Sequence, residues 1–245
     1  MTERSGLRVV SLVPSVTETL LAWGITPAAC TRFCEQPGLT HVGGTKDPDI
    51  AAIVALRPDL VVLCEEENRL ADHDRLQVLG VRCEVLRIDS VDDVAVELAR
   101  LARAVGATPP PGRLGEPAAD LAPPARRVRA FVPIWRRPWM TMSARCYGSS
   151  LLASLGVDNV YADAPDRYPQ CTLEQVAARA PDVVLLPTEP YPFAERHVAE
   201  LAAALAPARL VDGADLFWWG VRTPEAQRRL GAELAELAEL GAAGR

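Results

Sequence analysis

Short apolar runs alternate along the chain with segments in which apolar residues recur every three or four positions. The runs have the length of buried β-strands, and the periodic segments have the spacing of amphipathic helices. Strands are predicted at Leu60–Leu63, Val81–Ile88, Val128–Ile134, Asn159–Tyr161, Val183–Leu186 and Arg209–Val211. Helices are predicted at Val16–Trp23, Asp72–Leu79, Ser90–Val105, Gly148–Leu155, Glu195–Ala206 and Pro224–Leu240. Because strands and helices alternate, the pattern predicts an α/β protein built from parallel βαβ units.

Polar residues mark the starts of several of these helices. The segment Ser15–Glu18 has the Ser-x-x-Glu spacing of a capping box, in which the two side chains bind the first backbone N–H groups of a helix. A further helix is predicted to start at Asp47–Asp49, because the first turn of a helix tolerates the proline of this segment. Thr172 is predicted to cap a further helix.

One helix–turn–strand segment occurs twice. Ile50–Leu63 is echoed by Leu173–Leu186, with Pro58 and Pro181 at the same position of each copy and an aspartate after each proline. Two copies of one structural unit predict two similar lobes. A cleft between two lobes is a common place for a small ligand.

A proline-rich stretch separates the two halves of the chain. It covers residues 106–125, so the predicted domains are an N-terminal lobe at 1–105, a connector at 106–125 and a C-terminal lobe at 126–245. Within the connector only Leu114–Ala122 has a composition compatible with a helix.

Composition and charge exclude several classes of protein. The chain is 49% apolar and 24% charged with a net charge of −6, which is typical of a globular protein and does not indicate a nucleic-acid surface. No stretch has the roughly 20 apolar residues of a membrane span. The run Leu7–Val13 is too short for a secretory signal, so a cytoplasmic protein is predicted.

The cysteines and histidines do not predict a metal site. The six cysteines show no Cys-x-x-Cys pair and the three histidines are dispersed. Free buried thiols are the favoured interpretation over disulfides or metal ligands.

Several motifs resemble those of a known family, the helical-backbone metal receptors, or class III periplasmic-binding-protein-like proteins. The matching segments are Arg8–Glu18, Val42–Thr45, the two Pro-Asp repeats and Arg167–Gln170. Members of this family bind vitamin B12, ferric siderophores or haem for import. The resemblance covers nearly the whole chain and implies two Rossmann-like lobes with parallel sheets, a central ligand cleft and a helical connector, here shortened or proline-rich.

The resemblance also extends to intracellular, B12-receptor-like proteins without a signal peptide. The segments shared with them are Glu65–Arg69, Ile134–Trp139, Glu189–Phe193 and Asp212–Trp218.

The resemblance to the B12 receptor preserves only part of its ligand pocket. Aromatic residues of the corrin pocket fall on Phe33 and Tyr168, whereas two others fall on Thr45 and Cys64, which have no ring.

The import features of the family are also incomplete. Of the two surface glutamates that dock such receptors onto an ABC transporter, one matches Glu174 and the other falls on Ala51. Together with the altered connector, this departure argues against docking to a transporter but not against the fold. The sequence leaves a homo-oligomer open.

Candidate ligand-binding residues lie in loops that should follow the carboxyl ends of parallel strands, where open α/β sheets bind ligands. They are mostly aromatic or charged, which favours a flat organic ligand or metal chelate. From these loops they are Glu65, Glu66, Asn68, Arg69, Trp135, Arg136, Trp139, Tyr168, Glu189, Tyr191, Phe193, Arg196, Trp218 and Trp219. The resemblance adds Phe33 and Thr45. The alternative is that the tryptophans pack between the lobes.

Glu66 and Glu189 hold equivalent positions in the two copies of the repeat. If they faced each other they would share a proton and, with His197, form an acid–base site. The favoured alternative pairs them with arginines in a structural network. Two hypotheses result: a binding protein for a corrinoid-like or siderophore-like ligand, or a biosynthetic enzyme that acts on an aromatic metabolite with these acid–base residues and without a nucleotide cofactor. The sequence identifies no certain cofactor, and a corrinoid or metal chelate is expected only as the ligand.

Overall fold

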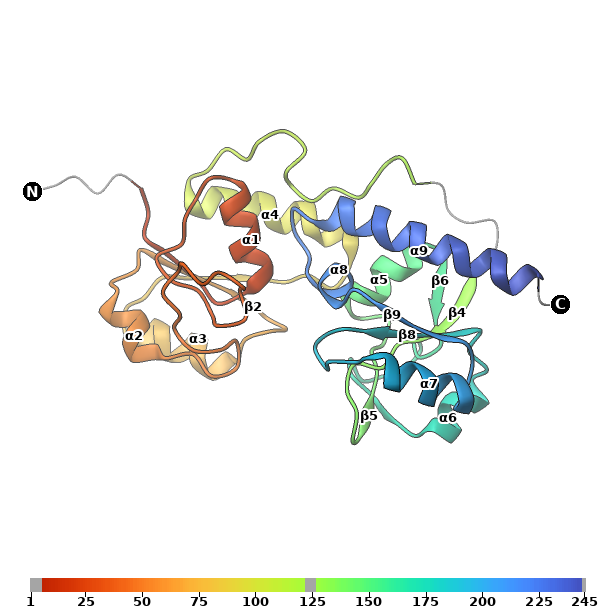
Figure 1. The fold of residues 1–245 in the computed structure, drawn as a ribbon. Coiled ribbons are helices and arrows are strands. Elements are labelled where there is room, and N and C mark those ends of the chain that lie inside the picture. Colours follow the sequence, from red (N-terminus) through yellow and green to blue (C-terminus); the bar gives the residue numbers. More distant parts are fainter. Residues whose placement is uncertain (1–5, 122–126, 244–245) are drawn as a thin grey trace, which may run out of the picture. The chain divides into compact units, whose positions relative to one another are not determined.

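The computed structural model describes residues 6–121 and 127–243, with side chains described up to Ala235 (Figure 1). The chain forms two compact units, each with its own parallel sheet. The first unit runs to Ile88 and adds Asp92–Glu116 and Trp219–Arg222. The second consists of Asp89–Val91, Pro117–Trp218 and the chain from Thr223 onwards. The domain bounds drawn from the proline-rich segment stay a prediction.

The first unit is built on a parallel three-stranded sheet in the order β1-β2-β3. Its strands are β1 (Val9–Ser11), β2 (Leu60–Cys64) and β3 (Cys83–Leu86). Every residue of the central strand β2 is buried, as expected for a strand covered on both faces. Its helices are α1 (Pro14–Ala22), α2 (Ile50–Ala55), α3 (Leu70–Val78) and α4 (Val91–Val105), whose first residue belongs to the second unit.

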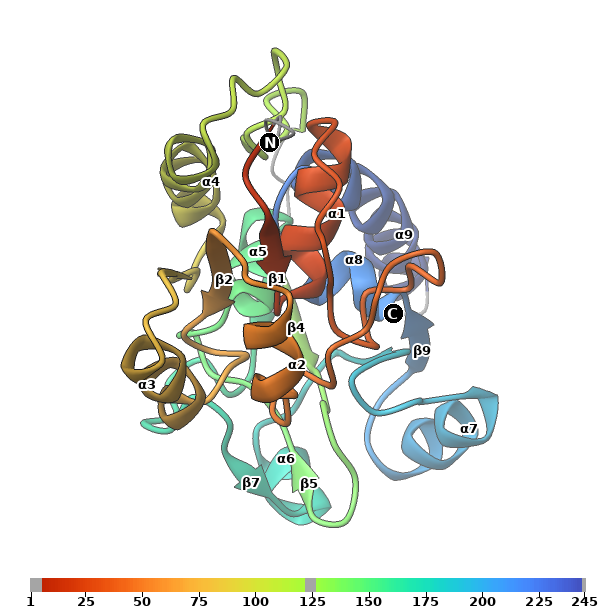
Figure 2. The same ribbon diagram turned by 90° about the vertical axis from the view of Figure 1, so that its left-hand side faces the viewer.

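The second unit contains a parallel four-stranded sheet in the order β6-β4-β8-β9. The strands are β4 (Val128–Phe131), β6 (Val157–Asn159), β8 (Val183–Pro187) and β9 (Ala208–Val211). A short antiparallel ribbon of β5 (Trp139–Met140) and β7 (Gln170–Cys171) leads directly into α6 (Figure 2). The helices are α5 (Tyr147–Ser154), α6 (Leu173–Ala178), α7 (Glu195–Ala204), α8 (Gly213–Phe217) and α9 (Thr223–Ala243).

The α/β class with parallel sheets is therefore confirmed, and the predicted repeat is present in both units. The helices α2 and α6 each have six residues, and the fully buried strands β2 and β8 each have five. The residue before each repeat proline, Arg57 or Ala180, has a left-handed backbone with a φ of 48° or 47°. This conformation reverses the chain between helix and strand, and the proline then prevents the helix from continuing.

The aspartate of each Pro-Asp pair binds the first strand of its own sheet. The Asp59 carboxylate accepts a hydrogen bond from the Arg8 backbone N–H at 2.7 Å, and the Asp182 carboxylate accepts one from Arg129 at 3.0 Å. In return, the aspartate N–H groups donate to the Arg8 and Arg129 carbonyls. The Pro-Asp pair therefore ends a helix and also fixes the start of the neighbouring strand.

Replacing Asp182 by alanine is expected to lower the free energy of unfolding by about 1 kcal/mol, because the Arg129 N–H loses a charged acceptor. Urea denaturation measures the loss. The matched control is Asp166→Ala, another exposed aspartate of the second unit, which should change stability by less than about 0.5 kcal/mol. Equal effects of the two substitutions would show that the Asp182 hydrogen bond adds nothing.

The predicted capping box at Ser15–Glu18 is wrong. Helix α1 begins at Pro14, its N-cap is Val13, and no side chain caps it. Proline supplies the helical φ of the first turn and removes one N–H that would need a partner. Ser15 is buried, and the Glu18 carboxylate accepts two hydrogen bonds from Arg222 at 2.8 and 3.1 Å instead.

The connector differs from the prediction as well. Its described part, up to Leu121, is not helical, and Ala122 lies outside the described residues. Trp23 Nε1 donates to the Arg113 carbonyl at 2.9 Å, and the Ala118 N–H donates to Gln227 Oε1 at 2.8 Å. Since these groups bind other elements, they do not form the i to i+4 ladder of a helix.

Most other predicted elements are confirmed within one to four residues, including the capping box of Thr172 with Gln175. Asp49 also caps α2 through the Ala52 N–H. The predicted strand Asn159–Tyr161 is shifted, because the Asn159 side chain accepts the Tyr161 N–H and turns the chain after β6. Among the described residues no helix is long and apolar enough to cross a membrane.

Candidate ligand-binding site

The loops after β4 and β8 meet at the carboxyl end of the second sheet. The two strands are neighbours and parallel, so both loops leave the sheet at the same edge. The loop after β4 carries Trp135, Arg136 and Trp139, and the loop after β8 carries Tyr191 and Phe193. This edge is where open α/β sheets place their ligands.

Four side chains from these loops form a continuous aromatic wall, defined as Trp135, Trp139, Tyr191 and Phe193. The ring centroids are 5.5 Å apart for Trp135 and Tyr191, 4.7 Å for Tyr191 and Phe193, and 6.2 Å for Trp139 and Phe193. Phe193 is buried, whereas Trp135 is 44% exposed. The wall therefore has a fixed apolar base and a large ring surface that faces solvent.

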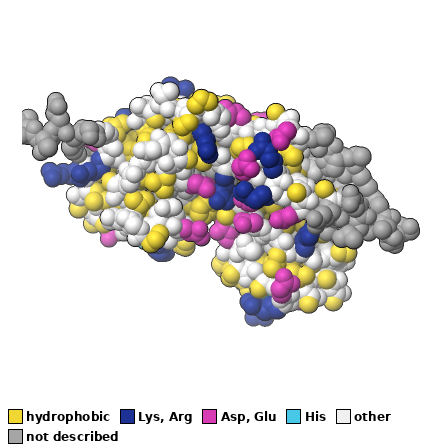
Figure 3. Space-filling view, turned by 45° about the horizontal axis from the view of Figure 1, so that its top comes forward, with side chains coloured by type: hydrophobic (Ala, Val, Ile, Leu, Met, Phe, Trp, Pro, Cys, Tyr) yellow, Lys and Arg dark blue, Asp and Glu magenta, His cyan; other side chains and the backbone are white. Residues whose placement is uncertain are grey.

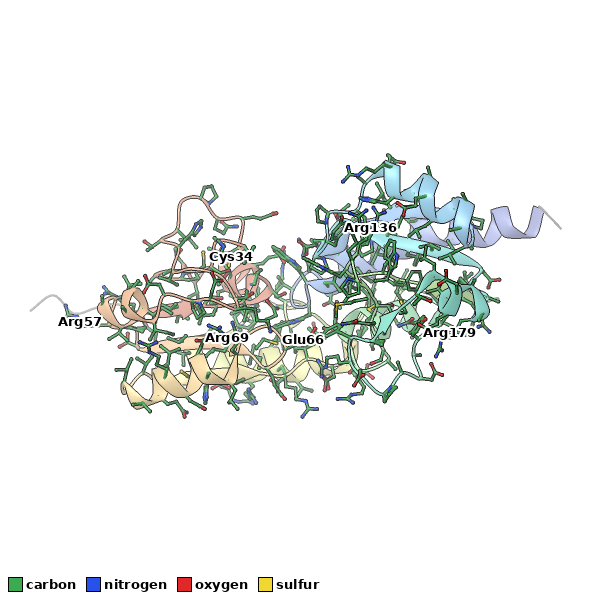
Figure 4. All side chains as sticks on the ribbon, turned by 90° about the horizontal axis from the view of Figure 1, so that it is seen from below. Cys34, Arg57, Glu66, Arg69, Arg136 and Arg179 are labelled. Atoms are coloured by element: carbon green, nitrogen blue, oxygen red, sulfur yellow. The ribbon has the colours of Figure 1, made fainter. Side chains whose placement is uncertain are left out.

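Arg136, which is labelled in Figure 4, lies beside this wall and is held by an acidic partner. Its guanidinium group lies 5.4 Å from the Trp139 ring centroid and donates to Glu200 at 2.6 Å. The cation–π contact and the ion pair together restrict Arg136 to one orientation. Glu200 was not predicted; its spacing of three residues from His197 on α7 was the signal that it shares a helix face with that residue.

His197 is part of the support of the wall. Its side chain is 1% exposed, and the ring centroid lies 5.8 Å from that of Tyr191 and 5.4 Å from that of Phe193. Nδ1 accepts a hydrogen bond from the Ala194 N–H at 3.0 Å, so the neutral ring carries its proton on Nε2. Burial, followed by the Arg196 and Arg136 charges, lowers the pKa of His197, while Glu200 and the Ala194 bond oppose the shift.

The stability of the protein should therefore depend on the charge state of His197. Because its folded pKa lies below the ordinary value of about 6.5, the unfolded chain binds the proton more readily. Stability is fully present above that pH and decreases as the pH falls from about 6.5 towards the folded pKa. Urea denaturation over this range measures the slope.

The variant His197→Gln isolates this effect, since glutamine accepts the same N-cap N–H but does not titrate. It should show a smaller loss of stability on acidification than the wild type. The exposed His41→Gln is the matched control and should keep the wild-type slope. A His197→Gln slope equal to that of the wild type would contradict the assignment.

Four other predicted ligand-binding residues belong to the second unit. Tyr168 and Trp218 are half-buried and Arg196 is exposed. Glu189 is half-buried and lies against Gly213, where a Cβ atom would come within 2.5 Å of the Glu189 backbone nitrogen and Cγ. Gly213 is thus needed for the close approach of the loop after β8 to α8. Ligand contact by these residues stays a prediction.

In the first unit, Asn68 connects three segments at the carboxyl end of the sheet. The buried amide accepts from the Cys64 N–H at 2.8 Å and donates to the carbonyls of Leu12 at 3.1 Å and Thr45 at 3.0 Å. Both of its N–H groups are thus used inside the unit. Asn68 fixes the loop after β2 against the exit of β1 and the Thr45 loop.

The charged residues after β2 have local partners. Arg69 forms two hydrogen bonds with Asp72 at 2.8 and 3.2 Å, and Glu65 lies 3.7 Å from Arg87. Lys46 Nζ donates to the Glu66 carbonyl at 2.7 Å and thereby holds the loop from its outer side. The partners Asp72 and Arg87, and the role of Lys46, were not predicted.

Phe33 is the exposed aromatic residue of the first unit, with 50% of its surface accessible. The Arg32 guanidinium lies 4.8 Å from its ring centroid and is itself held by Asp47 at 3.0 Å. Thr45 is half-buried and its carbonyl is bound by Asn68. Trp219, by contrast, is 4% exposed and belongs to the core rather than to an open surface.

The predicted site residues are divided between the two units. Glu66 belongs to the first unit and Glu189 to the second, so a shared proton between them stays a prediction. No group of three or more potential metal ligands occurs in the described part of the chain. On the face shown in Figure 3, acidic and basic side chains are interspersed.

Comparisons with known proteins agree with this architecture. No family model matches the chain. It is 28% identical over 194 residues to the vitamin B12-binding protein of Salmonella typhimurium strain LT2, covering 73% of this chain and 71% of that protein. The vitamin B12-binding protein of Yersinia pestis strain Pestoides F is 27% identical over 195 residues, covering 73% and 69%.

Solved structures show the same fold. The periplasmic vitamin B12 binding protein BtuF of Vibrio cholerae superposes with a TM-score of 0.76 at 21% identity, covering 95% of this chain and 98% of that one. The periplasmic heme-binding protein RhuT from Roseiflexus sp. RS-1 has a TM-score of 0.76 at 19% identity, covering 96% and 100%. A periplasmic heme binding protein from Pseudomonas aeruginosa gives 0.74 at 20%, covering 94% and 92%.

These relatives and solved structures are named as binding proteins for vitamin B12 or heme, and the chain shares the fold of the solved structures. The predicted resemblance to the class III periplasmic-binding-protein-like family is confirmed. The predicted cytoplasmic location is contradicted, because the proteins of the same fold are periplasmic. That prediction rested on the short apolar run Leu7–Val13, which is β1 with its flanking residues and carries no information about the compartment.

Proposed function

We propose that the protein binds a flat organic ligand, a corrinoid or another metal chelate, against the aromatic wall of the second unit. The observation that supports this proposal most strongly is the exposed Trp135 ring, which packs on a base of Tyr191, Phe193 and Trp139. A ring system of a planar ligand loses apolar surface to water when it stacks on such a wall. Arg136 offers a cation at the border of the wall for an acidic substituent of the ligand.

The relatives support this choice of ligand class. The relatives found by sequence are named for vitamin B12, and solved proteins of the same fold are named for vitamin B12 or heme. These ligands are large, conjugated macrocycles that hold a metal, so their apolar faces suit stacked aromatic side chains. The proposed ligand already contains its metal ion, so binding does not require metal ligands from the protein. This agrees with the cysteines and histidines, which are scattered along the sequence.

The enzyme hypothesis receives no support from the comparisons. His197 is buried beneath the wall, and its Nδ1 lone pair is used by the Ala194 N–H. Its position favours a role in holding Tyr191 and Phe193 over a role in proton transfer to a substrate.

Docking to a transporter through a pair of carboxylates is not part of the function we propose. The two relevant positions are the second residues of α2 and α6. Glu174 on α6 is exposed, whereas the equivalent residue on α2 is Ala51, which carries no charge.

Titration of the ligand-free protein with cyanocobalamin, haemin and a ferric siderophore tests the proposal, with glucose as a non-planar control. Absorbance of the chelate and tryptophan fluorescence report binding. At least one chelate should bind saturably with a Kd of about 1 μM or lower, equivalent to about −8 kcal/mol, and glucose should not bind. The absence of saturable binding by all three, with no small molecule retained in native mass spectrometry, would contradict the proposal.

A further inference from the structure

The arginine at the border of the aromatic wall already has a negatively charged partner on α7. Arg136 Nη2 donates to Glu200 Oε1 at 2.6 Å, and the two side chains are 19% and 39% exposed. The Arg136 guanidinium also lies 5.4 Å from the Trp139 ring centroid. The charge of Arg136 is therefore partly compensated before a ligand reaches the wall.

Glu200 lies on the side of α7 that supports the wall. It follows His197 by three residues and Arg196 by four, and residues at these spacings are neighbours on a helix surface. The His197 ring packs against two rings of the wall. Glu200 thus adds one negative charge to a border that holds two arginines, Arg136 and Arg196.

The first unit, taken by itself, contains the same arrangement around its exposed aromatic residue. The Arg32 guanidinium lies 4.8 Å from the Phe33 ring centroid and forms two hydrogen bonds with the Asp47 carboxylate, each 3.0 Å long. A Cβ atom on Gly44 would collide with Asp47 Oδ1 and Arg32 Nη2, so a glycine makes room for this ion pair. In each unit, an arginine beside an aromatic ring is therefore paired with a carboxylate.

An acidic substituent of a ligand would have to share Arg136 with Glu200. A guanidinium has five N–H donors, so the single contact with Glu200 leaves Arg136 able to donate to a ligand oxygen. The Glu200 carboxylate repels a ligand carboxylate at this place, whereas an amide carbonyl has no net charge and is not repelled. The ion pair therefore discriminates between two substituents of nearly the same shape.

We infer that Glu200 is a specificity-determining residue of the ligand site, which weakens the binding of chelates with carboxylate substituents but not of chelates with neutral amide substituents. The inference rests on the proposed function, because it requires a ligand stacked on the wall beside Arg136. It deepens that function by assigning to one residue the choice between acidic and neutral members of the ligand class.

A purely structural role of Glu200 predicts a different result. If Glu200 only oriented Arg136, its replacement would change the affinity for both kinds of chelate by the same factor. Glutamine at this position has the same length and still accepts the Arg136 N–H, but it has no charge. Because the ion pair is partly exposed, loss of the charge should change stability little and the variant should fold.

The test compares the wild-type protein and Glu200→Gln with two pairs of chelates, each pair sharing one ring and one metal. The pairs are dicyanocobyrinic acid with dicyanocobinamide, and zinc protoporphyrin with its diamide, and absorbance measures each Kd. In Glu200→Gln the Kd of the acid should fall by about 3-fold to 10-fold, and that of the amide should stay within about twofold. The gain should shrink when the salt concentration is raised from about 0.05 M to about 0.5 M, because salt screens the repulsion.

The matched control is Glu225→Gln, which removes the charge of another glutamate of the second unit that is paired with an arginine, Arg228. It should leave the ratio of the acid and amide Kd values as in the wild type. An unchanged ratio in Glu200→Gln, or an equal change in both variants, would overturn the inference and leave the proposed function intact. If neither pair binds to the wild-type protein, the inference fails, and the proposed function fails with it only if cyanocobalamin, haemin and the siderophore do not bind either.

Discussion

Replacing Asn68 by alanine is expected to lower the free energy of unfolding by about 3 kcal/mol, the largest loss that we expect for a single polar residue. The substitution removes three hydrogen bonds and leaves the Cys64 N–H and the carbonyls of Leu12 and Thr45 without their amide partner. Unsatisfied backbone groups in a buried site cost about 1–3 kcal/mol each unless water replaces the lost partner. Urea denaturation followed by far-ultraviolet circular dichroism measures the effect.

The matched control is Gln77→Ala, which removes an exposed amide from α3 in the same unit. It should change stability by less than about 0.5 kcal/mol. Asn68→Asp should also destabilise, because a carboxylate cannot donate to the two carbonyls. If Asn68→Ala were as stable as Gln77→Ala, the amide would not hold the three segments together.

Replacing Trp135 by alanine is expected to weaken binding of the planar ligand by about 10-fold to 100-fold. The substitution removes the exposed ring of the aromatic wall but leaves its buried base, because Phe193 and His197 contact each other without it. The titration of the wild-type protein, repeated on the variant, measures the change in Kd. Stability should fall only slightly, since the side chain is 44% exposed.

Trp23→Ala is the matched control for this prediction. Trp23 is a half-buried tryptophan of the first unit whose Nε1 binds the connector at Arg113. The Trp23→Ala substitution should leave the Kd within about twofold of the wild-type value, because residues that share no partner act independently of each other. Equal losses of affinity for the two variants would assign the effect of Trp135→Ala to general destabilisation.

The backbone could be predicted from the sequence largely because its signals are local. The repeated Pro-Asp segment predicted the paired helices and strands, since proline and a buried apolar run act within a few residues. The capping box at Ser15 failed because α1 begins one residue earlier, at Pro14, which places Ser15 inside the first turn. The Glu18 carboxylate binds Arg222 instead. Local spacing does not reveal a partner that is about two hundred residues away.

The sequence predicted which types of residue form the candidate site, but not how these residues are arranged in space. The loop tryptophans, Tyr191 and Phe193 were identified by type, yet the sequence did not separate the exposed Trp135 from the buried Trp219. Nor did it show that Asn68 has both donors engaged, or that Glu200 holds Arg136. These features depend on which loops meet at the sheet edge, and so on the tertiary structure.

Hydrogen–deuterium exchange of the protein with and without the bound chelate tests the central claim most directly. We predict slower exchange on binding in peptides that cover 132–141 and 188–198, the loops that carry the aromatic wall, and unchanged exchange in the 224–235 part of α9. Protection confined to other segments, with the two loops exchanging as in the free protein, would contradict a ligand site at the wall.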